Sequence, residues 1–218
     1  MQLSDAELAD INSQLEKKSS IEVVEWALGQ NKKTVVTTSF GFNSAVTLHM
    51  VTQVRHGVPV VWVDSGYNLK DAYVVAEELI QKLELNIHVY NPAMSCSRRE
   101  AVHGADFSLP GNPEFEDFKY QVKLEPFQRA LEDLQPEIWI SGIRKEETKF
   151  REKLGIVAMD ARGILKVSPL FNWTEADVSD YMMKHRLPNC RHYFDPTKVD
   201  SQSECGLHLS QFEQGGGI

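Results

Sequence analysis

Short β-branched runs alternate with amphipathic stretches through the middle of the chain. The runs have the length and composition of buried strands, and they lie at residues 34–38, 58–63, 86–90 and 137–141. Apolar residues at helical spacing fill the stretches between them, at residues 43–55, 70–84 and 125–134. Strands that alternate with helices in this way pair in parallel, with helices on both faces. The pattern therefore predicts an α/β fold with a doubly wound, mainly parallel sheet.

The pattern changes in the second half of the chain. Residues 156–159 and 164–167, which are apolar except for Lys166, flank Asp160-Ala161-Arg162-Gly163, a turn signal that predicts a short hairpin. Thr174 then has the position of a helix N-cap, with Asp177 completing a capping box, and the helix is expected to run to about His185.

Two segments carry little periodicity. Residues 92–120 are rich in Gly, Pro and charge and are predicted to form an irregular lid or insertion. Residues 188–218 are also irregular, and we expect them to be a flexible C-terminal tail. The length and the 42% apolar content suit one core, so residues 1–218 are expected to form a single domain.

Composition narrows the class of protein. The net charge of −8 argues against a general nucleic-acid surface, since that needs an excess of clustered Lys and Arg. No stretch approaches the roughly 20 apolar residues that span a membrane, and the N-terminus is acidic and polar, unlike a signal peptide. Three cysteines, none at a metal-ligand spacing, fit free thiols in a reducing compartment and no metal site. The expected location is the cytoplasm.

Three loops follow predicted strands, where ligands bind in parallel sheets. Residues 38–44 offer hydroxyls, a glycine and the free N–H groups of a helix start, which suit an anion. Residues 64–67 offer an acid, a glycine and an aromatic ring for an adenosine, and residues 141–151 concentrate four cations. The alternatives are an ordinary capped helix start for residues 38–44, a plain turn for residues 64–67 and a solvated charged helix for residues 141–151. Together the three loops favour an anionic nucleotide.

The segment Glu204-Cys205-Gly206-Leu207-His208 provides a candidate nucleophile. Cysteine is more often a small buried hydrophobic residue. A cysteine flanked by polar residues and followed by histidine three positions later can instead hold a partly ionised thiolate, although Glu204 opposes ionisation. Cys96 and Cys190 have no comparable surroundings and are interpreted as bystanders.

These motifs, in this order, resemble the phosphoadenylyl sulfate reductases of assimilatory sulfate reduction. Further matching motifs extend the resemblance over nearly the whole chain from Thr34: Lys123-Leu124-Glu125-Pro126, Gly142-Ile143-Arg144 and Lys166-Val167-Ser168-Pro169-Leu170. The resemblance implies the adenine nucleotide alpha hydrolase-like (PP-loop) fold, an enzyme that is often a homodimer, and no bound redox cofactor. It implies that Cys205 attacks the sulfur of 3′-phosphoadenylyl sulfate, and that thioredoxin, or glutaredoxin, later frees sulfite from the Cys S-sulfonate.

The resemblance also implies roles for individual residues. Ser39, Gly41 and Ser44 would hold the 5′-phosphosulfate, and His208 would lower the thiol pKa or bind the leaving group. The resemblance implies that the adenosine site is shaped by Asp64, Ser65, Gly66 and Gly142. It implies that the anionic charge of the substrate is balanced by Lys123, Arg144 and Arg151.

Differences from related enzymes define the alternatives. Phe40 and Asn43 replace the glycine and the acid of ATP-splitting loops, which disfavours an ATP pyrophosphatase. Relatives that reduce adenylyl sulfate carry a Cys-Cys pair and a Cys-x-x-Cys for an iron–sulfur cluster, and this chain lacks them, so no cluster is expected. Residues 188–203 are shorter than usual and lack a Gly-Tyr-x-Ser-x-Gly-Asp element, so Arg191, His192 and Lys198 are candidate substitutes. Adenylyl sulfate reduction, an ATP pyrophosphatase-type adenylating enzyme and a non-catalytic nucleotide-binding module stay open as alternatives.

Overall fold

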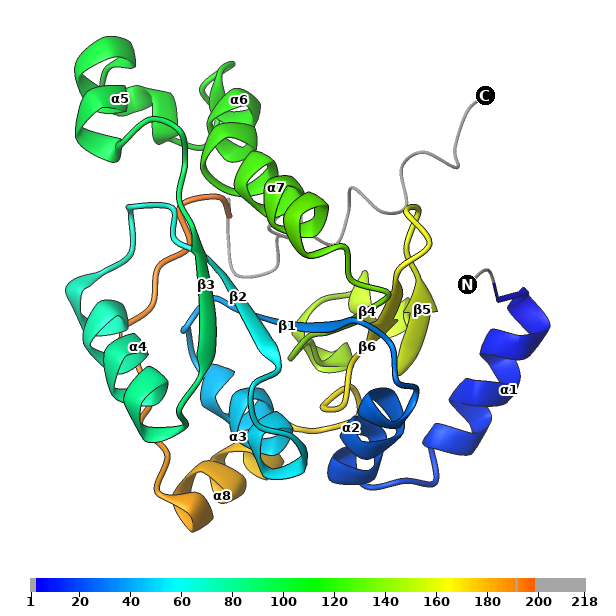
Figure 1. Ribbon diagram of the computed structural model, residues 1–218. Helices are drawn as coiled ribbons and strands as arrows, with labels where there is room; N and C mark the ends of the chain where they lie inside the picture. The colour runs from blue at the N-terminus through cyan, green and yellow to red at the C-terminus, as the bar shows by residue number, and fades with distance from the viewer. Residues whose placement is uncertain (1–2, 191, 199–218) are drawn as a thin grey trace.

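The computed structural model describes residues 3–190 and 192–198, and its centre is a six-stranded sheet in the order β3-β2-β1-β4-β6-β5 (Figure 1). All neighbouring strands are parallel except β5, which runs antiparallel to β6. The strands are β1 (Thr34–Thr38), β2 (Pro59–Val63), β3 (Asn86–Tyr90), β4 (Ile138–Ile140), β5 (Val157–Met159) and β6 (Leu165–Val167). The doubly wound, mainly parallel α/β prediction and the predicted hairpin are confirmed.

Eight α-helices accompany the sheet within the described residues. They are α1 (Asp5–Leu15), α2 (Ser20–Gly29), α3 (Ser44–Val54), α4 (Lys70–Lys82), α5 (Cys96–His103), α6 (Phe115–Lys119), α7 (Glu125–Leu134) and α8 (Glu175–His185). Short turns of other helix types are η1 (Ala105–Ser108), the π-helical η2 (Tyr120–Leu124), η3 (Lys145–Glu147) and η4 (Arg151–Lys153). The capping box predicted for α8, with Thr174 and Asp177, is present. Over this part of the chain, no helix has both the length and the apolar character needed to cross a membrane.

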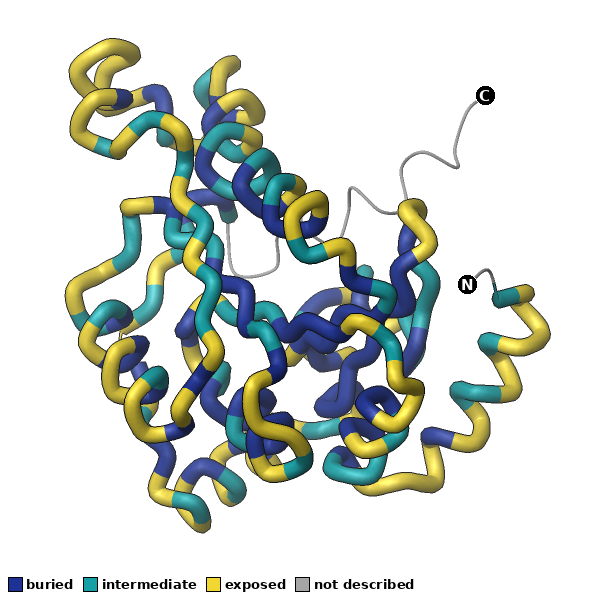
Figure 2. Tube along the Cα trace, viewed as in Figure 1, coloured by how far each residue is buried: buried dark blue, intermediate teal, exposed yellow. Residues whose placement is uncertain are grey.

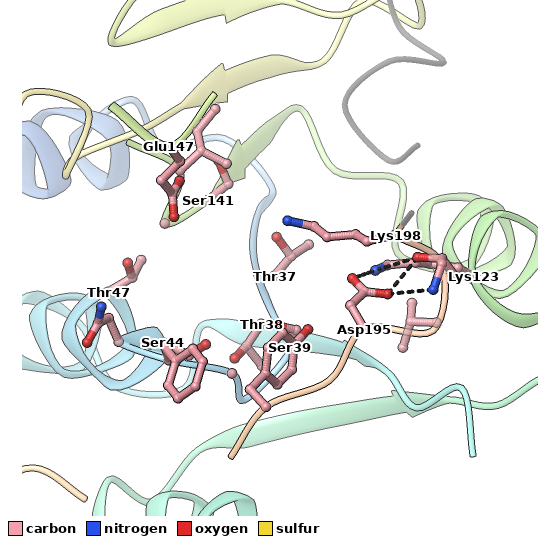
Figure 3. Close-up of a pocket in the computed structure, with 18 of the residues that line it drawn as sticks. Thr37, Thr38, Ser39, Ser44, Thr47, Lys123, Ser141, Glu147, Asp195 and Lys198 are labelled. Atoms are coloured by element: carbon pink, nitrogen blue, oxygen red, sulfur yellow. Dashed lines mark hydrogen bonds and ion pairs between the residues drawn. The ribbon is translucent and has the colours of Figure 1, made fainter. Parts of the chain in front are cut away.

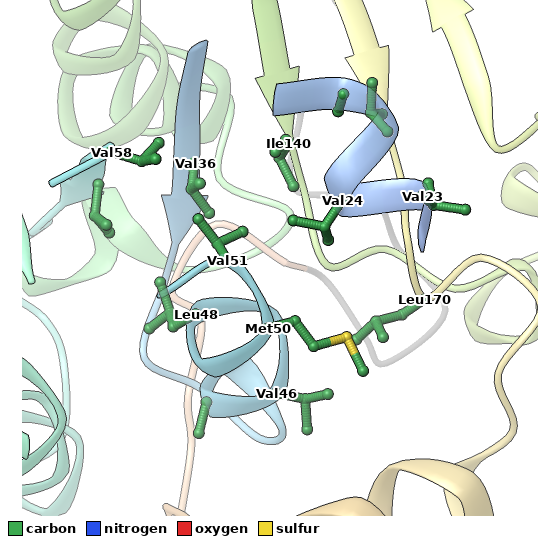
Figure 4. Packing of buried hydrophobic residues seen from close by; sticks show 14 of the residues in the cluster. Val23, Val24, Val36, Val46, Leu48, Met50, Val51, Val58, Ile140 and Leu170 are labelled. Carbon is green, nitrogen blue, oxygen red and sulfur yellow. The ribbon is translucent and has the colours of Figure 1, made fainter. Parts of the chain in front are cut away.

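The two faces of the sheet are covered unequally. Buried residues concentrate on the strands and on the sides of the helices that face them (Figure 2). On β1, Val36 belongs to a large cluster with α2, α3, α4 and α8, of which Figure 4 shows the part around α2 and α3. Its neighbour Val35 belongs to a smaller cluster with Phe127 and Leu131 of α7. Successive strand residues point to opposite faces, so one strand anchors both cores.

The segment 92–120 corrects the prediction of an irregular insertion. It contains α5, η1 and α6, and its residues form a small core of their own with η2: Phe107, Phe115, Phe118 and Val122. Tyr67 packs on this core through an edge-to-face contact with Phe118 at 5.3 Å. The helices have only eight and five residues, so they are too short to give a clear helical period, and tertiary aromatic contacts stabilise them instead.

The helix α1 closes the β5 edge of the sheet. The Asn12 side chain donates to the Val157 carbonyl at 2.9 Å and accepts from the Val157 N–H at 3.0 Å. A Cβ on Gly155 would meet the same amide at 2.6 Å, so glycine permits the close approach. One side-chain amide thus takes the place that a neighbouring strand's peptide group would occupy.

Candidate active site

A cavity of about 310 Å³ lies where the carboxyl ends of β1, β2 and β4 meet (Figure 3). Its size is at the lower end of the range of ligand pockets. All three loops predicted from the sequence contribute to its wall, together with η2 and a segment near the C-terminus. Among the predicted residues, those that line the cavity are Ser39, Gly41, Ser44, Ser65, Lys123, Gly142, Arg144 and Arg151.

The loop between β1 and α3 is shaped for an anion. Phe40 and Asn43 have positive φ values of 48° and 65°, in the left-handed region. The Phe40 side chain is fully buried against Trp62, with ring centroids 4.9 Å apart, which holds the loop to the sheet. The Asn43 side chain makes no capping bond to α3 and donates instead to Glu175, so no N-cap side chain occupies the positive end of the helix dipole.

A segment that we call the C-terminal strap, residues 188–190 and 192–198, packs on this loop. The Asn189 side chain accepts from the Asn43 N–H at 3.2 Å, and the Tyr193 ring lies so close to Gly41 that a Cβ there would approach it within 2.8 Å. Glycine at position 41 is therefore needed for the contact with Tyr193. The described part of the predicted tail contributes a wall of the cavity.

The strap is also joined to η2 by a nearly buried ion pair. Lys123 pairs with Asp195, and the two side chains are 12% and 7% exposed. Thr197 accepts from Lys123 at 3.2 Å and donates to Asp195 at 2.6 Å. Burial opposes ionisation of Asp195, but the Lys123 charge and the hydrogen bonds from Lys123 and Thr197 outweigh it and lower the pKa of the carboxyl.

Of the four cations in the third loop, Arg144 and Arg151 are buried and paired with carboxylates, whereas Lys145 and Lys149 are exposed. Arg144 donates to Glu146 at 2.7 Å and to Glu175 at 2.6 Å, while Arg151 donates to Glu147. The hydrogen bond from Asn43, followed by that from Arg144, lowers the pKa of Glu175 despite its partial burial. The alternative of a solvated charged helix does not hold for Arg144 and Arg151, which face inward, and the loop folds as the short η3 and η4.

The second loop has a more structural role than predicted. The Asp64 carboxylate accepts from the Gly66 N–H at 3.0 Å and from the Tyr73 hydroxyl at 2.8 Å. Burial and the bond to Asp64 raise the pKa of Tyr73 to about 12. Asp64 and Gly66 do not line the cavity, whereas Ser65 and Asn68 do. Asp64 therefore fixes the turn that presents Ser65 and Asn68.

Gly142 sits against α3. A Cβ at this position would lie 2.7 Å from Thr47 Oγ1, which is buried at the cavity wall and has no hydrogen-bond partner among the residues that the structure describes. A buried hydroxyl without a partner is costly unless a ligand or water satisfies it. Thr47 thus marks the region between α3 and β4 as a place for a polar ligand group.

Several residues in this arrangement were not predicted as site residues. Glu147 follows Arg144 in the same charged loop, and this charge pattern was a usable signal. Thr47, Tyr193, Asp195 and Thr197 join the cavity only through the tertiary fold. Cys205 and His208, the predicted catalytic pair, lie outside the described residues. Cys96 is partly exposed, and Cys190 is buried with its thiol donating to the His192 carbonyl at 2.9 Å.

Comparison with known proteins identifies the family. Residues 33–196 match the family model of the phosphoadenosine phosphosulfate reductase domain. The chain belongs to this family. A phosphoadenosine 5′-phosphosulfate reductase of a Synechococcus species is 33% identical over 226 residues, which cover 93% of this chain and 97% of the relative.

Solved structures agree with the family and the fold. A phosphoadenylyl-sulfate reductase from Candida auris, crystallised as a phosphate complex, superposes with a TM-score of 0.78 at 25% identity and covers 87% of this chain and 91% of its own. The Candida glabrata FMN adenylyltransferase, at 15% identity and a TM-score of 0.57 over 78% of this chain and 57% of its own, shares the fold alone. The predicted adenine nucleotide alpha hydrolase-like fold is confirmed. In residues 3–190 and 192–198, no group of three or more His, Cys, Asp or Glu side chains is arranged to hold a metal ion.

Proposed function

We propose that this member of the phosphoadenosine phosphosulfate reductase family reduces 3′-phosphoadenylyl sulfate to sulfite and adenosine 3′,5′-bisphosphate in the cytoplasm. The observation that carries the proposal is the cavity itself. It combines an uncapped helix start with cations from η2, from the loop after β4 and from the strap, all at the carboxyl edge of a parallel sheet. This arrangement fits a nucleotide that carries several anionic groups, and the family match points to the sulfonucleotide.

The proposed reaction uses the charges around the cavity. The Ser39–Ser44 loop and the start of α3 would hold the 5′-phosphosulfate, with Lys123, Arg144 and Arg151 near the developing charge. The Cys205 thiolate attacks the sulfur, the bond from sulfur to the bridging phosphate oxygen breaks, and the electron pair leaves with adenosine 3′,5′-bisphosphate. The enzyme is left with a Cys205 S-sulfonate, and His208 either lowers the thiol pKa or binds the leaving group.

A second thiol must complete the cycle. A thioredoxin thiolate attacks the Cys205 sulfur and expels sulfite, which leaves a mixed disulfide. The second thioredoxin thiol then resolves that disulfide, so the dithiol supplies both electrons and restores the Cys205 thiolate. The resemblance also allows glutaredoxin as the donor. Cys190 is a poor internal resolver, because it is 2% exposed and burial, together with Asp71, raises the pKa of its thiol.

The decisive test is the intact mass of reduced protein after incubation with 3′-phosphoadenylyl sulfate in the absence of thioredoxin. Wild type should gain about 80 Da, the mass of one SO₃ group, and added thioredoxin should remove it. Cys205→Ser should gain nothing. Cys96→Ser is the matched control, since Cys96 is partly exposed but has no proposed role, and it should still gain the adduct.

Parallel incubations with adenylyl sulfate and with ATP define the substrate. Wild type that forms no adduct with either sulfonucleotide contradicts the reductase proposal. Release of pyrophosphate from ATP under the same conditions would then support the ATP-using alternative. If neither an adduct nor pyrophosphate forms, the result supports the non-catalytic nucleotide-binding module.

A further inference from the structure

Lys198 differs from the other cations of the cavity in its surroundings. Lys123, Arg144 and Arg151 each contact at least one carboxylate. Lys198 also lines the cavity, and its side chain extends into it from the strap (Figure 3). Within the described part of the chain, the Lys198 ammonium makes no ion pair and no hydrogen bond. The cavity therefore holds one cation whose charge no described carboxylate balances.

The backbone around Lys198 is held in a tight turn. The Lys198 N–H donates to the Asp195 carbonyl at 3.2 Å, which closes the turn Asp195-Pro196-Thr197-Lys198. Asp195 Oδ1 accepts from the Thr197 N–H at 3.0 Å, and Thr197 is only 1% exposed. Because Asp195 is also paired with Lys123 of η2, the base of the Lys198 side chain is fixed relative to the cavity wall.

The charge balance of the cavity shows what Lys198 can bind. Asp195 and Glu147 at the cavity wall, and Glu175 beside it, already pair with Lys123, Arg151 and Arg144, so an anionic ligand must compete with these carboxylates for those cations. At Lys198 the ligand meets no such competition. An ammonium group in a recess that is partly shielded from water attracts a phosphate or sulfuryl oxygen more strongly than an exposed lysine does.

We propose that Lys198 is a substrate-contacting residue that binds an anionic group of the sulfonucleotide, either the 3′-phosphate or the 5′-phosphosulfate. The proposal builds on the proposed function, because it assigns a ligand contact within the same cavity. Lys198 stands in the shortened segment that lacks the Gly-Tyr-x-Ser-x-Gly-Asp element. A lysine presented by the Asp195–Lys198 turn would thus supply a contact from a segment where the sequence departs from its relatives.

The test compares Lys198→Gln and Lys198→Arg with Lys17→Gln, which removes the same charge from an exposed position before α2. Calorimetry measures the Kd of adenosine 3′,5′-bisphosphate and of AMP, which do not react, and steady-state assays measure kcat/KM for both sulfonucleotides. Loss of a charge-assisted hydrogen bond should weaken binding by about tenfold to a hundredfold in Lys198→Gln. Lys198→Arg should recover part of it, and Lys17→Gln should match wild type.

The two nucleotides separate the two anionic groups. A loss confined to adenosine 3′,5′-bisphosphate and 3′-phosphoadenylyl sulfate identifies the 3′-phosphate, whereas an equal loss that includes AMP identifies the 5′ group. In either case the Kd of Lys198→Gln should depend less steeply on salt concentration than the Kd of wild type, and the Tm of the free protein should be unchanged. A purely structural role of Lys198 would not produce this combination.

Affinities and kcat/KM values of Lys198→Gln within about twofold of wild type would overturn the proposal. The outcome is separable from the reductase test. Suppose that wild type forms no S-sulfonate but binds adenosine 3′,5′-bisphosphate more tightly than Lys198→Gln does. This result refutes the proposed reaction and supports the proposed contact of Lys198 with the nucleotide.

Discussion

The ion pair between Lys123 and Asp195 allows a quantitative test of how the strap is held. The two residues are 72 positions apart in the chain, and both side chains are almost buried. Removing one partner of a buried pair leaves the other charge without compensation, which costs about 3 kcal/mol or somewhat more. For a protein of this size, each kcal/mol lowers Tm by about 2–4 °C. Asp195→Ala should therefore lower Tm by about 6–12 °C, and Lys123→Ala should act similarly.

The double variant distinguishes the pair from the other contacts of each residue. Once Asp195 is absent, removing Lys123 no longer leaves an unpaired charge, so the double variant should lose only about 3–4 kcal/mol. The resulting coupling energy is about 2–3 kcal/mol. The bonds from Thr197 to Asp195 are lost in both variants that lack Asp195, so they cancel in the cycle.

The assay is urea unfolding followed by circular dichroism for all four proteins, with Tm measured in parallel. Adding adenosine 3′,5′-bisphosphate gives a second reading, because an anion near Lys123 should raise the Tm of Asp195→Ala more than that of wild type. Effects of the two substitutions that add within about 0.5 kcal/mol would refute the reasoning, since independent sites behave in that way.

Two further predictions concern the phosphate loop and the helix packed behind it. Gly41→Ala should raise the KM for 3′-phosphoadenylyl sulfate by about tenfold, because the new Cβ displaces the Tyr193 ring. Adding Tyr193→Ala to Gly41→Ala should recover most of the loss. A double variant no better than the single one would contradict this explanation. Burial, followed by the positive charges of His185 and Lys82, lowers the pKa of His49 from its ordinary 6.5, so folding favours neutral His49. The stability from this group should be complete above about pH 6.5 and should fall as the pH drops below it, and Tm measured from pH 8 to 5 should decline less in His49→Asn.

The central sheet could be predicted because local sequence determines it. The β-branched runs are short, those of β1, β2 and β4 are mostly buried, and the helices between the runs are amphipathic, so the period of the pattern changes where the structure changes. The helices α1 and α2 were missed although each begins with a capping box, Ser4 with Glu7 and Ser19 with Glu22, which the sequence displays. The insertion could not be predicted, since its helices are short and are held by tertiary contacts among Phe107, Phe115 and Phe118 and with Tyr67 from a distant loop.

The site divides along the same line. Parallel strands bring their carboxyl ends together, so the three loops were expected to share one cavity, and they do. The sequence predicts that Arg144 and Arg151 contribute positive charge to the site. It does not predict all of their partners, because Glu175, which pairs with Arg144, comes from the start of α8. Nothing local to Asp195 predicts its pairing with Lys123, because the contact depends on how the strap crosses the cavity.

The amide of Asn12 on β5 has a consequence for how copies of this chain behave toward one another. An open strand edge offers N–H and C=O groups to any other extended chain, and sheets with such edges join into larger assemblies. Asn12 occupies both groups of Val157, the first residue of β5. Asn12→Leu would leave the helix in place and free the edge. Heated samples of that variant should therefore scatter more light than wild type. That result would mean that the Asn12 side-chain amide protects the β5 edge from pairing with other copies of the chain.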